Sequence, residues 1–206
     1  MFKLSELFTS IQGEVQWVGR YSVFVRFAGC NLNCLFCDTP QKTKIDMEID
    51  VPRLLSYLKE AQAQHVVITG GEPLLNIAEI DYLLSELPEE VSVEIETNGT
   101  LLERVPNKWV GKVYFNISPK VHYRELYTSL PPDWPHTVYK FPVDETNLQE
   151  TKSFIMHHQI PKKIVYFMPI SKTYTEYVLN APIVLEEALS WRVNFSPRLQ
   201  LIQAVK

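Results

Sequence analysis

Residues 29–38 read Gly29-Cys30-Asn31-Leu32-Asn33-Cys34-Leu35-Phe36-Cys37-Asp38. All three cysteines of the 206-residue chain lie within eight residues of this run, in the spacing C-x3-C-x2-C. Structural zinc prefers four protein ligands, whereas three thiolates can hold three corners of a 4Fe-4S cluster and leave its fourth iron open. We therefore predict that Cys30, Cys34 and Cys37 bind such a cluster, and that chemistry takes place at the open iron.

Two other interpretations of these cysteines compete with the cluster. They could bind zinc together with a fourth ligand such as His65, or they could be ordinary thiols. Phe36, directly before the last cysteine, is either a core aromatic residue or a shield for the cluster that offers its face to a planar ring. Both roles of Phe36 are compatible with the cluster.

The composition limits the cellular setting and the partners. The chain has 20 basic and 24 acidic residues, and this net charge of -4 argues against a nucleic-acid surface. Charges interrupt the N-terminus before a leader could form, and no apolar run approaches the ~20 residues that cross a bilayer. Clustered cysteines in odd number fit a reducing compartment. We expect one cytoplasmic domain over residues 1–206, with small-molecule or protein partners, no membrane and no nucleic acid.

Strand-forming runs alternate with helical patterns along the chain. Strands are predicted at residues 23–27, 65–69, 91–95, 113–117, 138–141, 164–168 and, more weakly, 192–195. One helix is predicted to begin after Asp50, a cap followed by Pro52 in the first turn, and to run through residue 58. Two more helices are predicted at residues 77–87 and 148–157. About six strands are too few for a closed eight-stranded barrel of ~250 residues. The pattern predicts an α/β fold, an open partial barrel with a parallel sheet.

Polar residues follow four of the predicted strands. These segments are the cysteine loop, Thr69-Gly70-Gly71-Glu72-Pro73, Glu96-Thr97-Asn98-Gly99 and Ser118-Pro119-Lys120. Ligands of parallel α/β folds sit at the carboxyl ends of the strands, so we expect these loops to share one rim. Gly70 and Gly71 either make a plain turn or let the backbone approach the charged amino-acid end of a ligand. Glu72 either contacts that ligand or caps neighbouring backbone amides.

Three further segments carry candidate binding side chains. Arg26 lies between Val25 and Phe27 and points to the opposite face of its strand, where it either pairs with Glu14 or Glu94 or clamps a substrate carboxylate. The run Gln12-Gly13-Glu14 is either a turn or a reader of an aminopyrimidinone edge, because its side chains supply donors and acceptors. Thr39 is by default the hydroxyl of a turn.

With these motifs in place, the chain resembles radical S-adenosylmethionine enzymes, and within them the 7-carboxy-7-deazaguanine synthase family of queuosine and deazapurine biosynthesis. The resemblance rests on the cysteine spacing and on matching segments over residues 6–120. They are Glu6-Leu7-Phe8, Ile11-Gln12-Gly13-Glu14, residues 24–32, Cys37-Asp38-Thr39, residues 69–73, residues 96–100 and Ser118-Pro119-Lys120. Met168-Pro169-Ile170-Ser171 resembles a later family segment.

This resemblance implies a reaction and its cofactors. S-adenosylmethionine would chelate the open iron, and one electron from the cluster would cleave it to a 5'-deoxyadenosyl radical. The radical would take a hydrogen from C6 of 6-carboxy-5,6,7,8-tetrahydropterin, whose ring contracts with loss of ammonia to 7-carboxy-7-deazaguanine. The family regenerates S-adenosylmethionine and requires Mg2+. A reducing partner such as flavodoxin or ferredoxin, and a homodimer, are further expectations.

The resemblance also implies roles for individual residues. S-adenosylmethionine would be held by Phe36, Asp38, Gly71, Glu72, Ser118, Pro119 and Lys120. The pterin would be held by Ile11, Gln12, Gly13, Glu14, Arg26 and Thr69. Thr39 would bind Mg2+.

The chain departs from the family pattern at two places. Val15 stands where the family commonly has glycine, and residues 196–201 stand where it commonly has a Gln-x-His-Lys element. The second departure leaves open any substrate contact by the terminal carboxylate of Lys206. Two rival functions also stay open at this point. A glycyl-radical activating enzyme would use the same cysteine loop on a protein partner, and an electron carrier would want a fourth cysteine.

Overall fold

The computed structural model describes residues 1–34, 37, 39, 44–131 and 133–204 of the chain. These residues divide into two compact units. The first consists of Met1–Ser10, Arg20–Thr97 and Leu101–Phe115, and the second of Ile11–Gly19, Asn98–Thr100 and Asn116–Lys206. A single domain over residues 1–206 stays a prediction.

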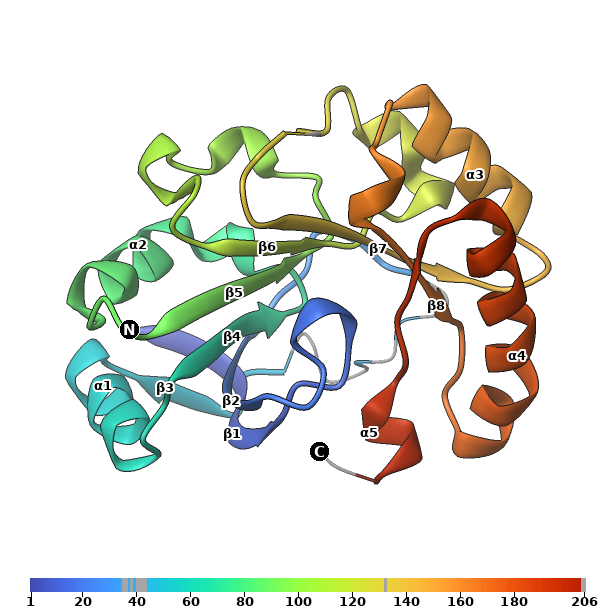
Figure 1. Cartoon of the computed structure of the whole chain (residues 1–206). Helices are drawn as coiled ribbons and strands as arrows, with labels where there is room; N and C mark the ends of the chain where they lie inside the picture. Colours follow the sequence, from blue (N-terminus) through green and yellow to red (C-terminus); the bar gives the residue numbers. More distant parts are fainter. Residues whose placement is uncertain (35–36, 38, 40–43, 132, 205–206) are drawn as a thin grey trace. The chain divides into compact units, whose positions relative to one another are not determined.

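The first unit is built on the strands β1 (Phe2–Ile11), β2 (Tyr21–Phe27), β3 (Met47–Ile49), β4 (His65–Gly70) and β5 (Ser92–Thr97). Their hydrogen-bonded order is β3-β1-β2-β4-β5, followed by the first residues of β6 (Tyr114–Ile117) (Figure 1). Strand β4 pairs in parallel with both β2 and β5, while β3 pairs antiparallel with β1. Residues 65–69 of β4 are all buried, which explains their nearly continuous apolar sequence.

Helices connect the strands of the first unit. Helix α1 (Val51–Glu60) begins where the Asp50 carboxylate accepts a hydrogen bond from the Arg53 backbone N–H at 3.0 Å, as its capping role predicts. Helix α1 buries Val51, Leu54 and Leu58, a spacing that forms one helix face. Helix α2 (Ile77–Glu86) follows the short 3-10 helix η2 (Pro73–Asn76). The 3-10 helices η3 (Leu102–Arg104) and η4 (Asn107–Trp109) lie between β5 and β6.

The second unit continues from the end of β6 to β7 (Thr137–Val143), β8 (Val165–Pro169) and β9 (Asn194–Phe195). The pairs β7–β8 and β8–β9 are parallel. The helices are α3 (Leu148–His157), α4 (Tyr174–Trp191) and α5 (Leu199–Ile202), with the 3-10 helices η1 (Val15–Trp17), η5 (Val121–Leu126) and η6 (Lys162–Ile164). Tyr139, Phe141 and Phe167 are fully buried and form its aromatic core. Helix α4 runs beside β8 in Figure 1, in agreement with their contacts.

The predicted fold class is confirmed. Among the described residues the strand order has two ends, β3 and β9, so the mostly parallel sheet is open. All seven predicted strands and all three predicted helices are present, with ends shifted by a few residues. None of the described helices is both long and apolar enough to cross a membrane.

The prediction missed β1, β3, α4 and α5. Strand β3 has three residues, two of them exposed, so it carries no apolar run. Helix α4 contains Pro182 in its interior and exposes Leu179, Leu185 and Leu189, which hides the usual contrast between a polar and an apolar face. Both elements depend on tertiary contacts more than on local pattern.

Candidate active site

The cysteine loop follows β2 in the first unit. Cys30, Cys34 and Cys37 are each half-buried, and none is part of a disulfide. The backbone N–H of Leu32 donates to the Cys30 Sγ at 3.4 Å, and that of Cys37 to the Cys34 carbonyl at 3.3 Å. The first of these, an N–H donor to sulfur, suits a thiolate ligand of an iron-sulfur cluster. The described part of the chain gathers no three His, Cys, Asp or Glu side chains into a metal site, so the cluster assignment depends on the thiol donors and their spacing.

The predicted cofactor residues Phe36 and Asp38 lie outside the described residues. Thr39 is described, and its carbonyl accepts a hydrogen bond from the Cys37 Sγ at 3.5 Å. A magnesium role for the Thr39 hydroxyl therefore stays a prediction.

The turn after β4 packs directly on the cysteine loop. The Gly71 N–H donates to the Phe27 carbonyl at 3.3 Å, and the Glu72 N–H donates to the Gly29 carbonyl at 2.9 Å. A Cβ built on Gly71 would overlap the Gly29 carbonyl and would lie 2.6 Å from the Cys30 Cβ. Only a glycine fits this approach, so the predicted juxtaposition of the Gly70-Gly71 turn with the cysteines is present.

Glu72 caps the turn. Its buried Oε1 accepts hydrogen bonds from the Leu74 N–H at 3.0 Å and from the Thr97 Oγ1 at 2.7 Å. The capping interpretation of Glu72 is therefore what the structure shows, and we retain it as a positioning residue. The neighbouring Thr69 donates from its Oγ1 to the Glu96 Oε2 at 2.9 Å. Glu96 opens one of the four polar segments expected at the rim, but the sequence prediction gave it no individual binding role.

Arg26 pairs with Glu6, which was not among the partners expected for it. Its Nε lies 2.8 Å from the Glu6 Oε2, whereas Glu14 and Glu94 were the expected partners. Glu94 lies instead beside His65, with Nε2 to Oε2 at 3.4 Å. Arg26 is the register partner of Thr69 across β2 and β4, so the two predicted substrate residues share one face of the sheet.

The second unit holds the other predicted substrate residues. Ile11 ends β1, and the Gln12 Oε1 accepts hydrogen bonds from the backbone N–H groups of Gly13 at 2.8 Å and Glu14 at 3.3 Å. The Glu14 Oε2 lies 2.5 Å from the Lys140 Nζ, and its Oε1 lies 2.7 Å from the Gln200 Nε2 and 3.5 Å from the Arg198 Nε. The structure thus places the side chains of Lys140, Arg198 and Gln200 around the buried Glu14 carboxylate.

These contacts determine the charge of Glu14. Burial alone would raise its pKa, but the charges of Lys140 and Arg198 and the hydrogen bonds from Lys140 and Gln200 lower the pKa to about 2. Glu14 is therefore a carboxylate at any working pH. Sequence reasoning missed Lys140, Arg198 and Gln200. A charged residue between Tyr139 and Phe141 was the available signal for Lys140.

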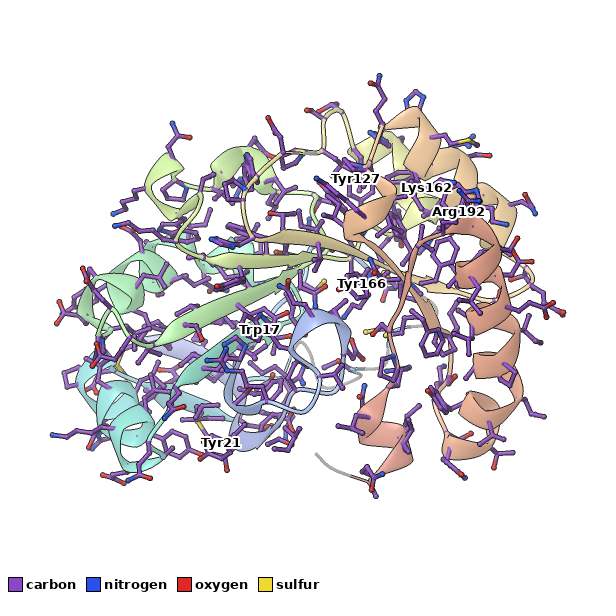
Figure 2. The ribbon with its side chains drawn as sticks, viewed as in Figure 1. Trp17, Tyr21, Tyr127, Lys162, Tyr166 and Arg192 are labelled. Carbon is purple, nitrogen blue, oxygen red and sulfur yellow. The ribbon has the colours of Figure 1, made fainter. Side chains whose placement is uncertain are left out.

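The segment Ser118-Pro119-Lys120 is an ordered loop of the second unit. The Lys120 Nζ donates to the Ser118 Oγ at 2.8 Å. The hydroxyl of Tyr127, labelled in Figure 2, accepts from the Lys120 N–H at 2.8 Å and donates to the Asn98 carbonyl at 2.9 Å. The loops after β5 and β6 are therefore linked, as the shared rim predicts for this part of the chain.

Comparisons with known proteins identify relatives across the whole chain. The Radical SAM superfamily matches residues 24–131. The 7-carboxy-7-deazaguanine synthase of Hyperthermus butylicus is 35% identical and covers 98% of this chain and 92% of its own length. The enzyme of the same name from Buchnera aphidicola is 30% identical, with 94% of each chain covered.

Solved structures agree on the fold. The crystal structure of QueE from Escherichia coli matches with a TM-score of 0.68 and 21% identity over 96% of this chain and 94% of that one. Streptococcus suis SuiB, bound to a precursor peptide, matches with a TM-score of 0.52 and 15% identity, over 84% of this chain and 47% of that one. From the Radical SAM match and from sequence matches that cover 98% and 94% of the chain, we conclude that it belongs to the 7-carboxy-7-deazaguanine synthase family of radical SAM enzymes.

Proposed function

We propose that the chain converts 6-carboxy-5,6,7,8-tetrahydropterin to 7-carboxy-7-deazaguanine with release of ammonia. The observation that carries this proposal is the three-cysteine loop packed against Gly71, in a chain that matches synthases of this name over nearly its whole length. A glycyl-radical activating enzyme and an electron carrier lack this support.

The donor chemistry of the predicted cofactor residues fits the proposed cofactors. Cys30, Cys34 and Cys37 would hold the cluster, whose bound S-adenosylmethionine supplies the radical that takes the C6 hydrogen. The Gly71 backbone, which admits no side chain, would hold the amino-acid end of S-adenosylmethionine, with Ser118, Pro119 and Lys120 as further contacts. A flavodoxin or ferredoxin would deliver the electron. A cytoplasmic setting and a homodimer complete the proposal.

The pterin contacts follow from the charge and donor pattern of the protein. Glu14, an ionised acceptor, suits the neighbouring N–H donors of an aminopyrimidinone edge, and Gln12 lies beside it. Arg26 would bind the C6 carboxylate through its two Nη atoms, because its recorded ion pair with Glu6 uses only Nε. Thr69, its register partner, would add a hydroxyl.

Product analysis tests the proposed function directly. The enzyme is reconstituted anaerobically with iron and sulfide and incubated with the carboxytetrahydropterin, S-adenosylmethionine, Mg2+ and a reductant. We expect 7-carboxy-7-deazaguanine and ammonia in more than stoichiometric amounts over S-adenosylmethionine, because the family regenerates it. Cleavage of S-adenosylmethionine without formation of 7-carboxy-7-deazaguanine would reject the proposal, and a reaction without the carboxytetrahydropterin is the control.

Arg26→Lys tests the carboxylate clamp. Lysine keeps the charge but loses the planar pair of donors. We expect a loss of ~1–3 kcal/mol of transition-state stabilisation, which lowers kcat/KM for the pterin roughly 5- to 150-fold. Cleavage of S-adenosylmethionine without turnover should persist. Arg53→Lys, an exposed substitution of the same kind on α1, is the matched control. Unchanged kinetics in Arg26→Lys would leave Arg26 as a partner of Glu6 only.

Thr39→Ala tests the magnesium assignment. A single neutral oxygen holds Mg2+ weakly, so we expect the substrate carboxylate to share the ion. The variant should need several-fold more Mg2+ for half-maximal turnover while its cluster spectrum stays unchanged. A Mg2+ titration identical to that of the wild type would remove Thr39 from the site.

A further inference from the structure

Lys140 is a charged residue in the middle of the apolar strand β7. Only 8% of it is exposed, and its sequence neighbours Tyr139 and Phe141 are fully buried. A buried ammonium is costly unless it is paired, and here its Nζ lies 2.5 Å from the Glu14 Oε2. The two residues are 126 positions apart in the chain, so the pair joins the start of the second unit to its sheet.

The Glu14 carboxylate is held at both of its oxygens. The Lys140 Nζ lies 2.5 Å from Oε2, the Gln200 amide donates to Oε1 at 2.7 Å, and the Arg198 Nε lies 3.5 Å from Oε1 as an ion-pair partner. A carboxylate offers about four acceptor positions, and the hydrogen bonds from Lys140 and Gln200 use one on each oxygen, so about one further position per oxygen is not used by these two hydrogen bonds. Two such positions side by side match two adjacent N–H donors, the pattern that the aminopyrimidinone edge of a pterin presents.

The backbone around Glu14 is fixed as well. The Val15 N–H donates to the Ser196 Oγ at 2.8 Å, and the Leu199 N–H donates to the Gly13 carbonyl at 3.0 Å. Val15 has a φ of 51°, in the left-handed region that β-branched residues avoid. A strained residue persists only where its surroundings determine it, and such residues gather at functional sites. The strain beside Glu14 therefore indicates that the place of this carboxylate is under constraint.

We propose that Lys140 is the positioning residue of Glu14: its ammonium group keeps the carboxylate ionised and sets its plane so that the two oxygens accept together from the pterin edge. This role rests on the proposed function. Gln200 supports the second oxygen, so the ion pair and the amide together determine the orientation.

The charges around Glu14 set the direction of the pH effect. Among the described residues, the charged groups that face Glu14 are Lys140 from β7 and Arg198 from the segment before α5. With both present, the pKa of Glu14 is lowered from its usual 4.5 to about 2. The stability that the ionised Glu14 contributes is therefore fully present above pH 4.5 and is lost as the pH falls through about 2. Without the Lys140 charge, only Arg198 and Gln200 oppose the effect of burial, so the pKa of Glu14 is higher than in the wild type. A Glu14 that becomes protonated cannot accept both hydrogen bonds.

The test compares Lys140→Met with Lys140→Arg in the reconstituted enzyme. Lys140→Met should raise the pterin KM about tenfold at pH 8 and further as the pH is lowered to 6, while the wild-type KM stays nearly flat. Lys140→Arg, which keeps the charge, should recover most of the affinity. Direct binding of fluorescent 6-carboxypterin should show the same order. Cleavage of S-adenosylmethionine without turnover should stay within about twofold, because Lys140 acts on the pterin through Glu14.

Controls separate positioning from folding. Lys152→Met breaks the Lys152–Glu187 pair of the same unit, 2.8 Å between Nζ and Oε2, and should leave the pterin KM unchanged. Lys140→Gln replaces Lys140→Met if the latter does not fold. In the background of Glu14→Gln, Lys140→Met should have little additional effect on KM.

Two results would overturn the proposal for different reasons. A wild-type enzyme that forms no 7-carboxy-7-deazaguanine from the pterin rejects the proposed function and this role with it. Product formation by the wild type, together with a KM in Lys140→Met that is unchanged or raised equally at every pH, rejects the positioning role alone.

Discussion

Replacing Cys34 by alanine should abolish the iron-sulfide absorbance and all cleavage of S-adenosylmethionine. The three thiolates bind three of the four irons of the cluster. Only two thiolates remain in the variant, so a second iron, besides the open one, has no protein ligand. The loss should therefore be complete rather than graded. Iron and sulfide content after anaerobic reconstitution and the yield of 5'-deoxyadenosine measure it.

A control on the same loop distinguishes the ligand from its surroundings. Lys44 is 71% exposed and pairs with Asp46, so Lys44→Ala should keep the cluster. A wild-type protein that takes up zinc but no iron, or a Cys34→Ala variant that keeps a full cluster, would contradict the assignment of the thiols.

Gly71→Ala should damage the cluster site although it changes no cysteine. The added methyl group would overlap the Gly29 carbonyl and would come within 2.6 Å of the Cys30 Cβ, and neither neighbour can turn aside as a long side chain can. Overpacking of this kind costs ~1–3 kcal/mol of stability, and the shift needed to relieve it moves Cys30. We expect cluster content and S-adenosylmethionine cleavage to fall about tenfold or more.

The matched control is Gly19→Ala, because among the described residues no atom beyond the two chain neighbours lies within 4 Å of a Cβ built at Gly19. This variant carries only the backbone cost of a φ of 88° and should keep its cluster. Iron content and a thermal melt of both variants compare the two effects. If Gly71→Ala matches the wild type in both measurements, the turn does not constrain the cysteine loop.

Local sequence determined the features that depend on residues close together in the chain, namely the strands, the helix cap and the cysteine motif. Strand runs, the Asp50 cap and the alternation of strands with helices predict an open α/β fold because burial and capping follow from residues close together in the chain. The three cysteines predict a cluster because their spacing is itself the ligand pattern. The family resemblance over residues 6–120 is confirmed by relatives that match the whole chain.

Only the tertiary structure decided which charges meet. Arg26 pairs with Glu6 rather than with Glu14 or Glu94, because the arrangement of the strands selects its neighbour. Glu14 meets Lys140 and Gln200, which are 126 and 186 positions away, and no local pattern records such a distance. An ion pair depends on where strands and loops lie after folding, whereas a cysteine spacing or a helix cap is complete within a few residues. The sequence by itself therefore determined the fold class and the cluster motif. The folded chain decided which residues surround the Glu14 carboxylate and keep it ionised.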